Sequence, residues 1–416
     1  MSVTPTTQPS APTRSSPPPA PQAVRAALDR FVVWLDGYGE TSQDHQDFFA
    51  SRVGRAAKSL YYKHPRLGTV AVLPMVACEA FAPWTRKYFY PRMRLPIADA
   101  HYAMGFAHLH RLTGNPKHLE RARHFLEVLK QSRCPGYDDR WGWGYPFDWQ
   151  TKGGILARGT PLITTTPYCY EAFADVHAID PRPEWRDALH AIAEHCLLDY
   201  RDIVLSPGVA TCTYTPTGGE RVVNASAYRA YTLFRAWKEF GDERYRTAAE
   251  PNLRFVLQCQ LEDGSWPYAV DGKRPFVDHF HTCFVMKALA KIEALTGDAA
   301  CTRALQTGIA YYLQYLFDDE GLPKPFARAP RLTVYRRELY DCAECINLGV
   351  LLRGRFYELD QAVDRTVTEL IERWQLPTGS FRSRKLLLSW DNVPMHRWGQ
   401  SEVFRALALY SCLRTS

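Results

Sequence analysis

The segment Gln260-Leu-Glu-Asp-Gly-Ser-Trp266 returns along the chain at a regular spacing. It recurs as Gln375-Leu-Pro-Thr-Gly-Ser-Phe381, and Phe317-Asp-Asp-Glu-Gly-Leu322 stands halfway between the two. The turn glycines of this series are 56, 57 and 58 residues apart and are Gly208, Gly264, Gly321 and Gly379. A period of this length is typical of repeat architectures, in which each repeat is a small unit that its neighbours must cover.

Each repeat has the pattern of a helical hairpin. An apolar helix comes first, and a Gly-Asn or Gly-Asp corner follows, as at Gly114-Asn115, Gly241-Asp242 and Gly297-Asp298. Glycine in this place is a typical helix C-cap. The second helix is apolar on one side only, so we expect it outside the first. The inner helices should begin near residues 68, 97, 167, 225, 279, 342 and 398, and the outer helices should occupy 24–37, 117–132, 184–199, 244–259, 301–316 and 359–374.

Consecutive hairpins form either an open solenoid or a closed toroid. The long, aromatic loops that enter the inner helices at one end favour closure around a shared mouth. We therefore expect an all-α fold, an (α/α)6 toroid of about six hairpins that occupies residues 23–416 as a single domain. Residues 1–22 contain seven Pro, four Ser and four Thr, which predicts a disordered Pro-rich tail, with a ligand for a partner as the alternative.

The composition excludes several functions. The net charge of +7 comes from 51 basic and 44 acidic residues without a long basic run, so we expect no nucleic-acid partner. No stretch of 18 apolar residues occurs, which predicts no integral membrane segment, and no secretory signal is visible. Eleven cysteines, an odd number, lie mostly in apolar helical patterns, which favours reduced thiols and a cytoplasmic location. The oligomeric state stays open.

Several of these motifs resemble known families. Gln260–Trp266 is similar to the QW-type motif of squalene–hopene cyclase repeats, and Asp278-His-Phe-His281-Thr282 is similar to the Asp-x-x-His-Thr entry of protein prenyltransferase β subunits. Together with Trp143-Gly-Tyr-Pro-Phe147 and Thr213-Tyr-Thr-Pro216, the set resembles bacterial carbohydrate-processing and polysaccharide-biosynthesis proteins of the (α/α)6 fold. The resemblance covers roughly residues 60–413. It implies a glycan substrate and leaves hydrolysis, elimination and epimerisation open, since one fold hosts many reactions.

The departures from these families bear on cofactors. The chain has no Asp-x-Asp-Asp acid of class II terpene cyclases, no Asp-x-Cys pair upstream of His281, and no Cys-His-Gly string of lanthipeptide cyclases. We therefore predict no metal and no cofactor. A terpene cyclase or prenyltransferase-like enzyme, with aromatic rings that stabilise carbocations, remains an alternative. A non-catalytic glycan-binding scaffold is the third hypothesis.

Rings and charges before successive inner helices suggest one shared site. Trp143, Asp148 and Trp149 lie in a Gly/Pro-broken loop whose rings suit sugar faces, although the loop could also be a plug that closes the toroid. His279 and His281 open a helix, and imidazole titrates near neutrality. Asp341 and Glu344 share a helix face at i, i+3, where a carboxylate pair suits acid/base work at a sugar carbon, although a salt-bridged helix start explains them too.

The candidate site residues fall into two groups. The catalytic candidates are His281, Asp341, Glu344, Tyr340 and Tyr214. The candidates for substrate binding are Trp143, Asp148, Trp149, Tyr168, His279, Arg337, His396, Arg397 and Trp398. Capping of the helix start is the alternative role for Tyr168 and its neighbour Glu171. We expect an enzyme that acts by acid/base chemistry on a glycan, acidic glycans included, in surface-polysaccharide metabolism.

Overall fold

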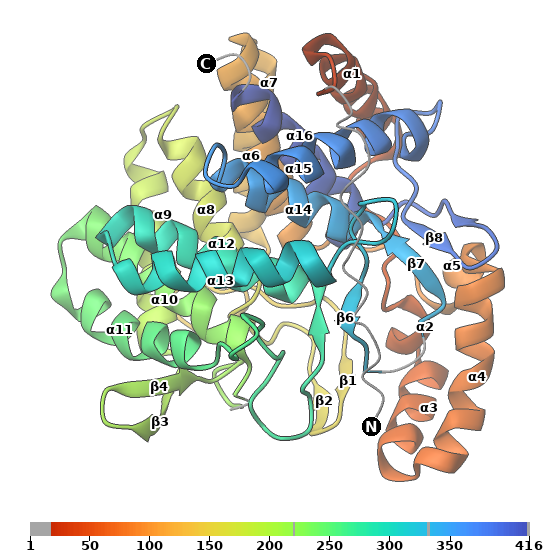
Figure 1. The fold of residues 1–416 in the computed structure, drawn as a ribbon, viewed down its shortest axis with the longest axis horizontal. Helices are drawn as coiled ribbons and strands as arrows, with labels where there is room; N and C mark the ends of the chain where they lie inside the picture. The colour runs from red at the N-terminus through yellow and green to blue at the C-terminus, as the bar shows by residue number, and fades with distance from the viewer. Residues whose placement is uncertain (1–17, 219–220, 331–332, 414–416) are drawn as a thin grey trace, which may run out of the picture.

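Six inner helices form a closed ring in the computed structural model, which describes residues 18–218, 221–330 and 333–413. The order of contacts around the ring is the order of the chain, and the last helix packs on the first. The inner helices are α6 (Pro96–Thr113), α8 (Thr166–His177), α10 (Val223–Phe240), α12 (His279–Thr296), α14 (Leu339–Leu351) and α16 (Ser401–Leu413). This arrangement confirms the predicted all-α toroid (Figure 1).

An outer helix covers each position of the ring. The outer helices are α1 (Pro21–Tyr38), α7 (Pro116–Gln131), α9 (Pro183–Leu198), α11 (Glu243–Gln258), α13 (Ala299–Tyr315) and α15 (Tyr357–Glu369), which continues into the π-helical turn η2 (Leu370–Trp374). Helix α1 begins at Pro21, inside the range expected to be tail, while residues 1–17 lie outside the described part. The predicted corners are confirmed: Gly114, Gly241 and Gly297 adopt left-handed conformations that end inner helices.

The repeated glycine turn fixes the distance between successive outer helices. Gly264 has a φ of +89°, and a Cβ at this position would lie 2.4 Å from the carbonyl oxygen of Thr307 in α13. Gly379 has a φ of +103° and would meet the carbonyl oxygen of Arg30 in α1 at 2.3 Å. Glycine is therefore required twice over, for its conformation and for its lack of a side chain.

The glutamine of the repeated segment closes the ring. Gln260 Nε2 donates to the carbonyl oxygens of Gly264 and of Ala304 in α13, which is the next outer helix. Gln375 makes the same pair of bonds, to Gly379 at 3.0 Å and to Ala27 at 2.8 Å. Because Ala27 belongs to α1, the last repeat is bonded to α1 in the same way as the Gln260 repeat is bonded to α13.

One predicted inner helix lies elsewhere. The apolar helix expected near residue 68 is α4 (Pro65–Phe81), which packs on α3 (Arg52–Lys63) at the periphery of the ring (Figure 1). The hairpin is flanked by α2 (Asp47–Ala50), η1 (Pro83–Thr85) and α5 (Arg86–Phe89). The prediction was wrong because a helix that is apolar on all sides shows only that it is hydrophobic. The pattern does not show which element packs on the helix.

Short strands brace the loops between hairpins. The pairs are β1 (Trp149–Thr151) with β2 (Gly154–Leu156), β3 (Asp202–Ser206) with β4 (Val209–Cys212), and β5 (Val277–Asp278) with β6 (Phe326–Arg328). A three-stranded sheet contains β7 (Tyr335–Glu338), β8 (Arg384–Leu386) and β9 (Trp390–Asp391), and the kinked turn η3 (His396–Gln400) precedes α16. Several pairs join loops of neighbouring repeats, so they position side chains at the amino ends of the inner helices.

Candidate active site at the amino ends of the inner helices

Aromatic side chains form a circuit where the loops enter the inner helices, an end of the ring that we call the entry end. Trp398 stacks on Tyr340 with ring centroids 5.9 Å apart, and Tyr340 lies 5.1 Å from Phe280. On the other side of Trp398, the guanidinium of Arg397 lies 3.6 Å from its ring and 4.4 Å from that of Tyr145. The partly buried members of the circuit are Tyr145, Trp149, Tyr214, Tyr268, Phe280 and Trp398, which we call the aromatic rim.

An aspartate–histidine pair lies within this circuit. Asp278 is the N-cap of α12 and accepts a hydrogen bond from the backbone N–H of His281. The Nδ1 atom of His281 is 2.6 Å from Asp278 Oδ2, so the carboxylate holds the ring in the tautomer with its proton on Nδ1. The side chain of His281 is 22% exposed, its ring lies 4.6 Å from that of Tyr268, and its Nε2 has no hydrogen-bond partner among the described residues. Nε2 is therefore available to exchange a proton with a bound molecule.

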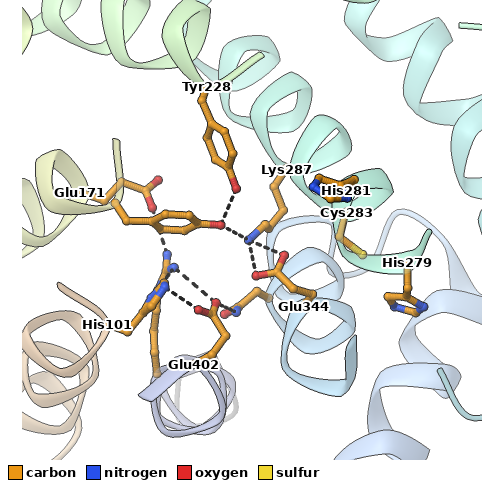
Figure 2. A network of polar contacts seen from close by, with 12 residues as sticks. His101, Glu171, Tyr228, His279, His281, Cys283, Lys287, Glu344 and Glu402 are labelled. Carbon is orange, nitrogen blue, oxygen red and sulfur yellow. Dashed lines mark hydrogen bonds and ion pairs between the residues drawn. The ribbon is translucent and has the colours of Figure 1, made fainter. Parts of the chain in front are cut away.

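A buried polar network fills the centre of the ring, further along α12 and α14 than His281 and Tyr340 (Figure 2). Lys287 Nζ is 2.7 Å from Glu344 Oε2 and donates to the hydroxyl of Tyr168 at 3.3 Å. That hydroxyl is 2.7 Å from the hydroxyl of Tyr228. Four inner helices thus contribute one side chain each to a continuous chain of polar atoms.

Glu344 is poised to hold a proton near neutral pH. Burial raises the pKa of its carboxyl to about 7, Lys287 opposes this shift, and the neighbouring carboxylate of Glu402 adds to it. Glu402 is itself 2.5 Å from His101 Nε2 and accepts a hydrogen bond from Asn347. Burial, together with the positive charges of Arg405 and Lys287, lowers the pKa of His101 well below its usual value, which keeps this imidazole neutral.

A second ionic group lies further along the ring axis. Glu171 contacts Lys291 and lies 3.2 Å from Arg405 Nη2. Burial alone would raise the pKa of Glu171, but the two cations outweigh it and lower the pKa well below the usual value. Two buried glutamates in one ring therefore differ in protonation because one faces two cations, whereas the other faces one cation and a second carboxylate.

The buried carboxyl group of Asp341 makes no hydrogen bond within the described residues. Both carboxyl oxygens are buried without a hydrogen-bond partner among the described residues. Burial, followed by the negative charges of Glu338 and Asp278, raises the pKa of Asp341 well above its usual value. Asp341 and Glu344, the carboxyl pair predicted for acid/base work, therefore both have a raised pKa in the folded protein.

Four of the expected binding residues make their contacts within the protein. The indole of Trp143 is fully buried and donates to the carbonyl oxygen of Leu129. His279 lies apart from the central network in Figure 2, with Nε2 2.8 Å from the Tyr312 hydroxyl and Nδ1 3.2 Å from a carbonyl oxygen. We leave these residues out of the candidate site because every polar atom has a structural partner.

His396 and Arg337 follow the same pattern. His396 is held between the hydroxyl of Tyr102, at 2.5 Å from Nδ1, and the carbonyl oxygen of Gly39, at 3.0 Å from Nε2. Arg337 is buried and pairs with Asp318 and Glu320, which belong to a turn on the outside of the ring. Both ring nitrogens of His396 are bonded, whereas the Nη1 atom of Arg337 is buried without a hydrogen-bond partner among the described residues.

The other candidates lie at or near the entry end. Tyr214 belongs to the aromatic rim, and its hydroxyl is 3.1 Å from that of Thr164. Trp149 also belongs to the rim, and its ring lies 5.7 Å from that of Tyr145. Asp148 accepts a hydrogen bond from the backbone N–H of Arg158 and is half-buried. Arg397 is buried and donates two hydrogen bonds to Asp44, and its guanidinium packs against the rings of Tyr145 and Trp398 in the rim.

Sequence reasoning missed several central residues. Lys287, His101, Arg405 and Glu402 are absent from the site residues predicted from the sequence. A signal was present, because each is an ionisable residue in a largely apolar stretch of an inner helix, and such residues are rarely buried without a partner. Among residues 18–218, 221–330 and 333–413, no group of three or more His, Cys, Asp or Glu side chains is placed to hold a metal ion.

Comparisons with known proteins identify the architecture. No protein-family model matches the chain, and no curated protein matches its sequence. Among solved structures, a D-mannose isomerase superposes with a TM-score of 0.60 at 13% identity, over 98% of this chain and all of that one. A cellobiose 2-epimerase from Bacillus thermoamylovorans gives 0.58 at 9% identity, over 77% of this chain and 88% of that one. A variant unsaturated glucuronyl hydrolase from Streptococcus agalactiae gives 0.58 at 11% identity, over 96% and 92%. At such identities the likeness establishes the fold.

Proposed function

We propose that this protein is a carbohydrate-active enzyme that moves protons at a sugar carbon bound at the entry end. The observation that carries the proposal is the Asp278–His281 pair, with its half-buried imidazole among the rings of the aromatic rim. Flat rings suit the faces of sugars, and an oriented neutral imidazole suits proton abstraction. Proteins of the same fold with epimerase, isomerase, lyase and hydrolase names support a glycan as substrate.

The central carboxyls favour proton transfer over hydrolysis. A hydrolase of the two-carboxylate kind needs its groups about 5–9.5 Å apart, one on each side of the scissile bond. Beside Lys287 and the carboxylate of Glu402, the buried carboxyl of Glu344 favours its protonated form near neutral pH. A carboxyl that holds a proton in this way suits storage and delivery of a proton.

Roles follow from this geometry. His281 Nε2 removes or returns the proton at carbon, and Asp278 stabilises the imidazolium that forms. The Tyr340 ring continues the rim inward, and its helix also carries Glu344 one turn further on. The chain from Glu344 through Lys287 to the Tyr168 hydroxyl supplies the second proton reservoir. We further propose that the substrate belongs to surface-polysaccharide metabolism, with uronic-acid glycans included.

Solvent-isotope exchange tests this proposal. The protein is incubated in D₂O with neutral and uronic-acid oligosaccharides, and NMR follows the loss of C–H signals. We expect deuterium to enter one sugar carbon, and we expect His281→Asn and Asp278→Asn to slow this exchange by about a hundredfold or more. His279→Asn is the matched control for His281→Asn, because the same residue type is replaced two positions away; it should change stability more than exchange.

Three results would contradict the proposal. Glycan cleavage with oxygen from water in the product and no deuterium at carbon would establish a hydrolase. Turnover of an isoprenoid in place of every glycan would support the terpene-processing alternative. Binding of glycans with neither exchange nor cleavage, unchanged in His281→Asn, would favour a non-catalytic scaffold.

A further inference from the structure

Helix α4 presents a continuous apolar face to solvent. Its exposed large apolar side chains are three residues apart in the first half of the helix, recur at its end after eight residues, and continue into the segment beyond the bend. They are Leu67 (65% exposed), Val70 (70%), Leu73 (59%), Phe81 (71%), Trp84 (58%) and Tyr88 (71%), which we call the apolar stripe. Contiguous exposed patches of this kind mark sites that bind another molecule or a membrane.

No described part of the chain covers the stripe. The ring is complete with its six inner helices, and only Gly68 and Met75 of α4 are buried. Residues 1–17, which precede the described part, contain Met1 and Val3 as their only large apolar side chains. A segment of that composition cannot bury six large apolar residues.

The same region carries the whole net positive charge of the protein. Residues 48–95 contain nine of the 51 Lys and Arg residues and one of the 44 Asp and Glu residues. Outside this region, 43 acidic residues face 42 basic ones. The single acidic residue, Glu79, pairs with Arg86 and Arg384. The exposed cations Lys63 and Arg66 lie at one end of α4, and Lys87 lies beside the rings of Trp84 and Tyr88.

We propose that the hairpin of α3 and α4 docks the protein onto the surface of an anionic lipid bilayer. Apolar side chains with Lys and Arg at their margins are the composition of helices that lie in the plane of a membrane interface. Trp and Tyr at one end suit the headgroup level. Basic residues near an anionic surface add attraction that salt weakens.

Neither a membrane span nor a second copy fits as well. No single helix in the described residues is long and apolar enough to cross a membrane; α4 passes that test only together with the Pro83–Phe89 segment, across a bend of 116°. A symmetric contact between two copies would bring two strongly positive hairpins together, which like-charge repulsion opposes. An anionic bilayer covers the stripe and neutralises the cations at once.

Vesicle co-sedimentation of the full-length protein tests the proposal. Vesicles of phosphatidylcholine alone are compared with vesicles that contain about a third phosphatidylglycerol, at low and at high salt. Leu73→Glu/Phe81→Glu places two charges in the stripe. Val204→Glu/Tyr357→Glu is the matched control, because these two side chains are 72% and 69% exposed on other parts of the surface. Lys63→Ala/Arg66→Ala/Lys87→Ala removes three cations, with Lys117→Ala/Lys238→Ala/Lys273→Ala as its control.

We expect the wild type to sediment with anionic vesicles and to be released by salt. The stripe variant should lose at least about tenfold in partitioning, and the triple Ala variant of the hairpin about a hundredfold at low salt, while both controls match the wild type. Equal binding of the stripe variant and its control would overturn the proposal. So would a wild type that ignores anionic vesicles and forms a dimer, in sedimentation velocity, that the stripe variant dissolves.

Discussion

Replacement of Glu344 by Gln should make the stability of the protein less dependent on pH. Burial raises the pKa of this carboxyl from 4.5 to about 7 in the folded protein. The folded state therefore keeps its proton at pH values where the unfolded chain has lost it. The cost to stability is absent below about pH 4.5, builds up as pH rises, and is complete above about pH 7.

The size of the effect follows from the shift. At about 1.4 kcal/mol for each pH unit, a pKa of about 7 against 4.5 costs about 3.4 kcal/mol at high pH. Between pH 5 and pH 8 the wild type should lose about 2.5 kcal/mol through this group. Glu344→Gln carries no titrating carboxyl and should not lose it. The variant should therefore gain about 2.5 kcal/mol relative to the wild type over this interval.

Urea unfolding of the wild type and of Glu344→Gln at pH 5 and pH 8 gives the change in unfolding free energy with pH for each protein, and the two changes are compared. Other titrating groups are shared by the two proteins and cancel. Glu171→Gln is the matched control, because it also removes a buried glutamate of the ring. The pKa of Glu171 lies well below the usual value, since its two cationic partners outweigh burial, so it is ionised in the folded state throughout the interval. Its removal should destabilise by an amount that is nearly the same at both pH values.

One result would refute the reasoning. If Glu344→Gln changed the unfolding free energy equally at pH 5 and pH 8, the carboxyl would be ionised at both, and Glu344 could not serve as a proton reservoir near neutrality. Carbon-13 NMR of labelled glutamate would then be expected to show an ordinary titration for this group.

Three further changes test the repeat and the site. Gly264→Ala should lower the unfolding free energy at least twice as much as Gly297→Ala, which should cost about 1 kcal/mol, because both glycines have positive φ but only Gly264 has backbone within 2.4 Å of its missing Cβ; equal losses in urea titrations would contradict the close-contact argument. Gln375→Ala removes one side-chain hydrogen bond to Ala27 in α1 and one to Gly379 within the last repeat, and should cost about 1–3 kcal/mol, with faster hydrogen exchange in α1, whereas unchanged exchange there would show that the ring closes without it. His279→Asn should lower the melting temperature while His281→Asn should not, because only His279 has both ring nitrogens bonded within the protein; a reversed order in thermal scans would contradict the assignment of roles.

The amino-acid sequence by itself determined what depends on neighbours in the chain. The turns of the repeat and of the corners require positive φ angles that few residues other than glycine adopt. Gly264 and Gly297 therefore indicate these turns from the local sequence. The period between such glycines, with one apolar and one amphipathic helix in each interval, was enough to predict the toroid. The proline-rich composition of the predicted tail misplaced the start of α1 by three residues, at 24 in place of 21, because Pro21 suits a first helical turn as well as a tail.

The tertiary structure alone decided which side chains meet. Lys287 and Glu344 are 57 residues apart and adjoin only because α12 and α14 are neighbours in the ring. The same holds for His101 and Glu402, which pair across the closure between the first and last inner helices. Sequence spacing reports the face of one helix, and a pKa depends on charges from several. For that reason their spacing predicted a shared role for Asp341 and Glu344, whereas burial and their separate neighbours set the chemistry of each. Likewise, α4 has the composition of an inner helix, and only the packing of the ring leaves it at the surface.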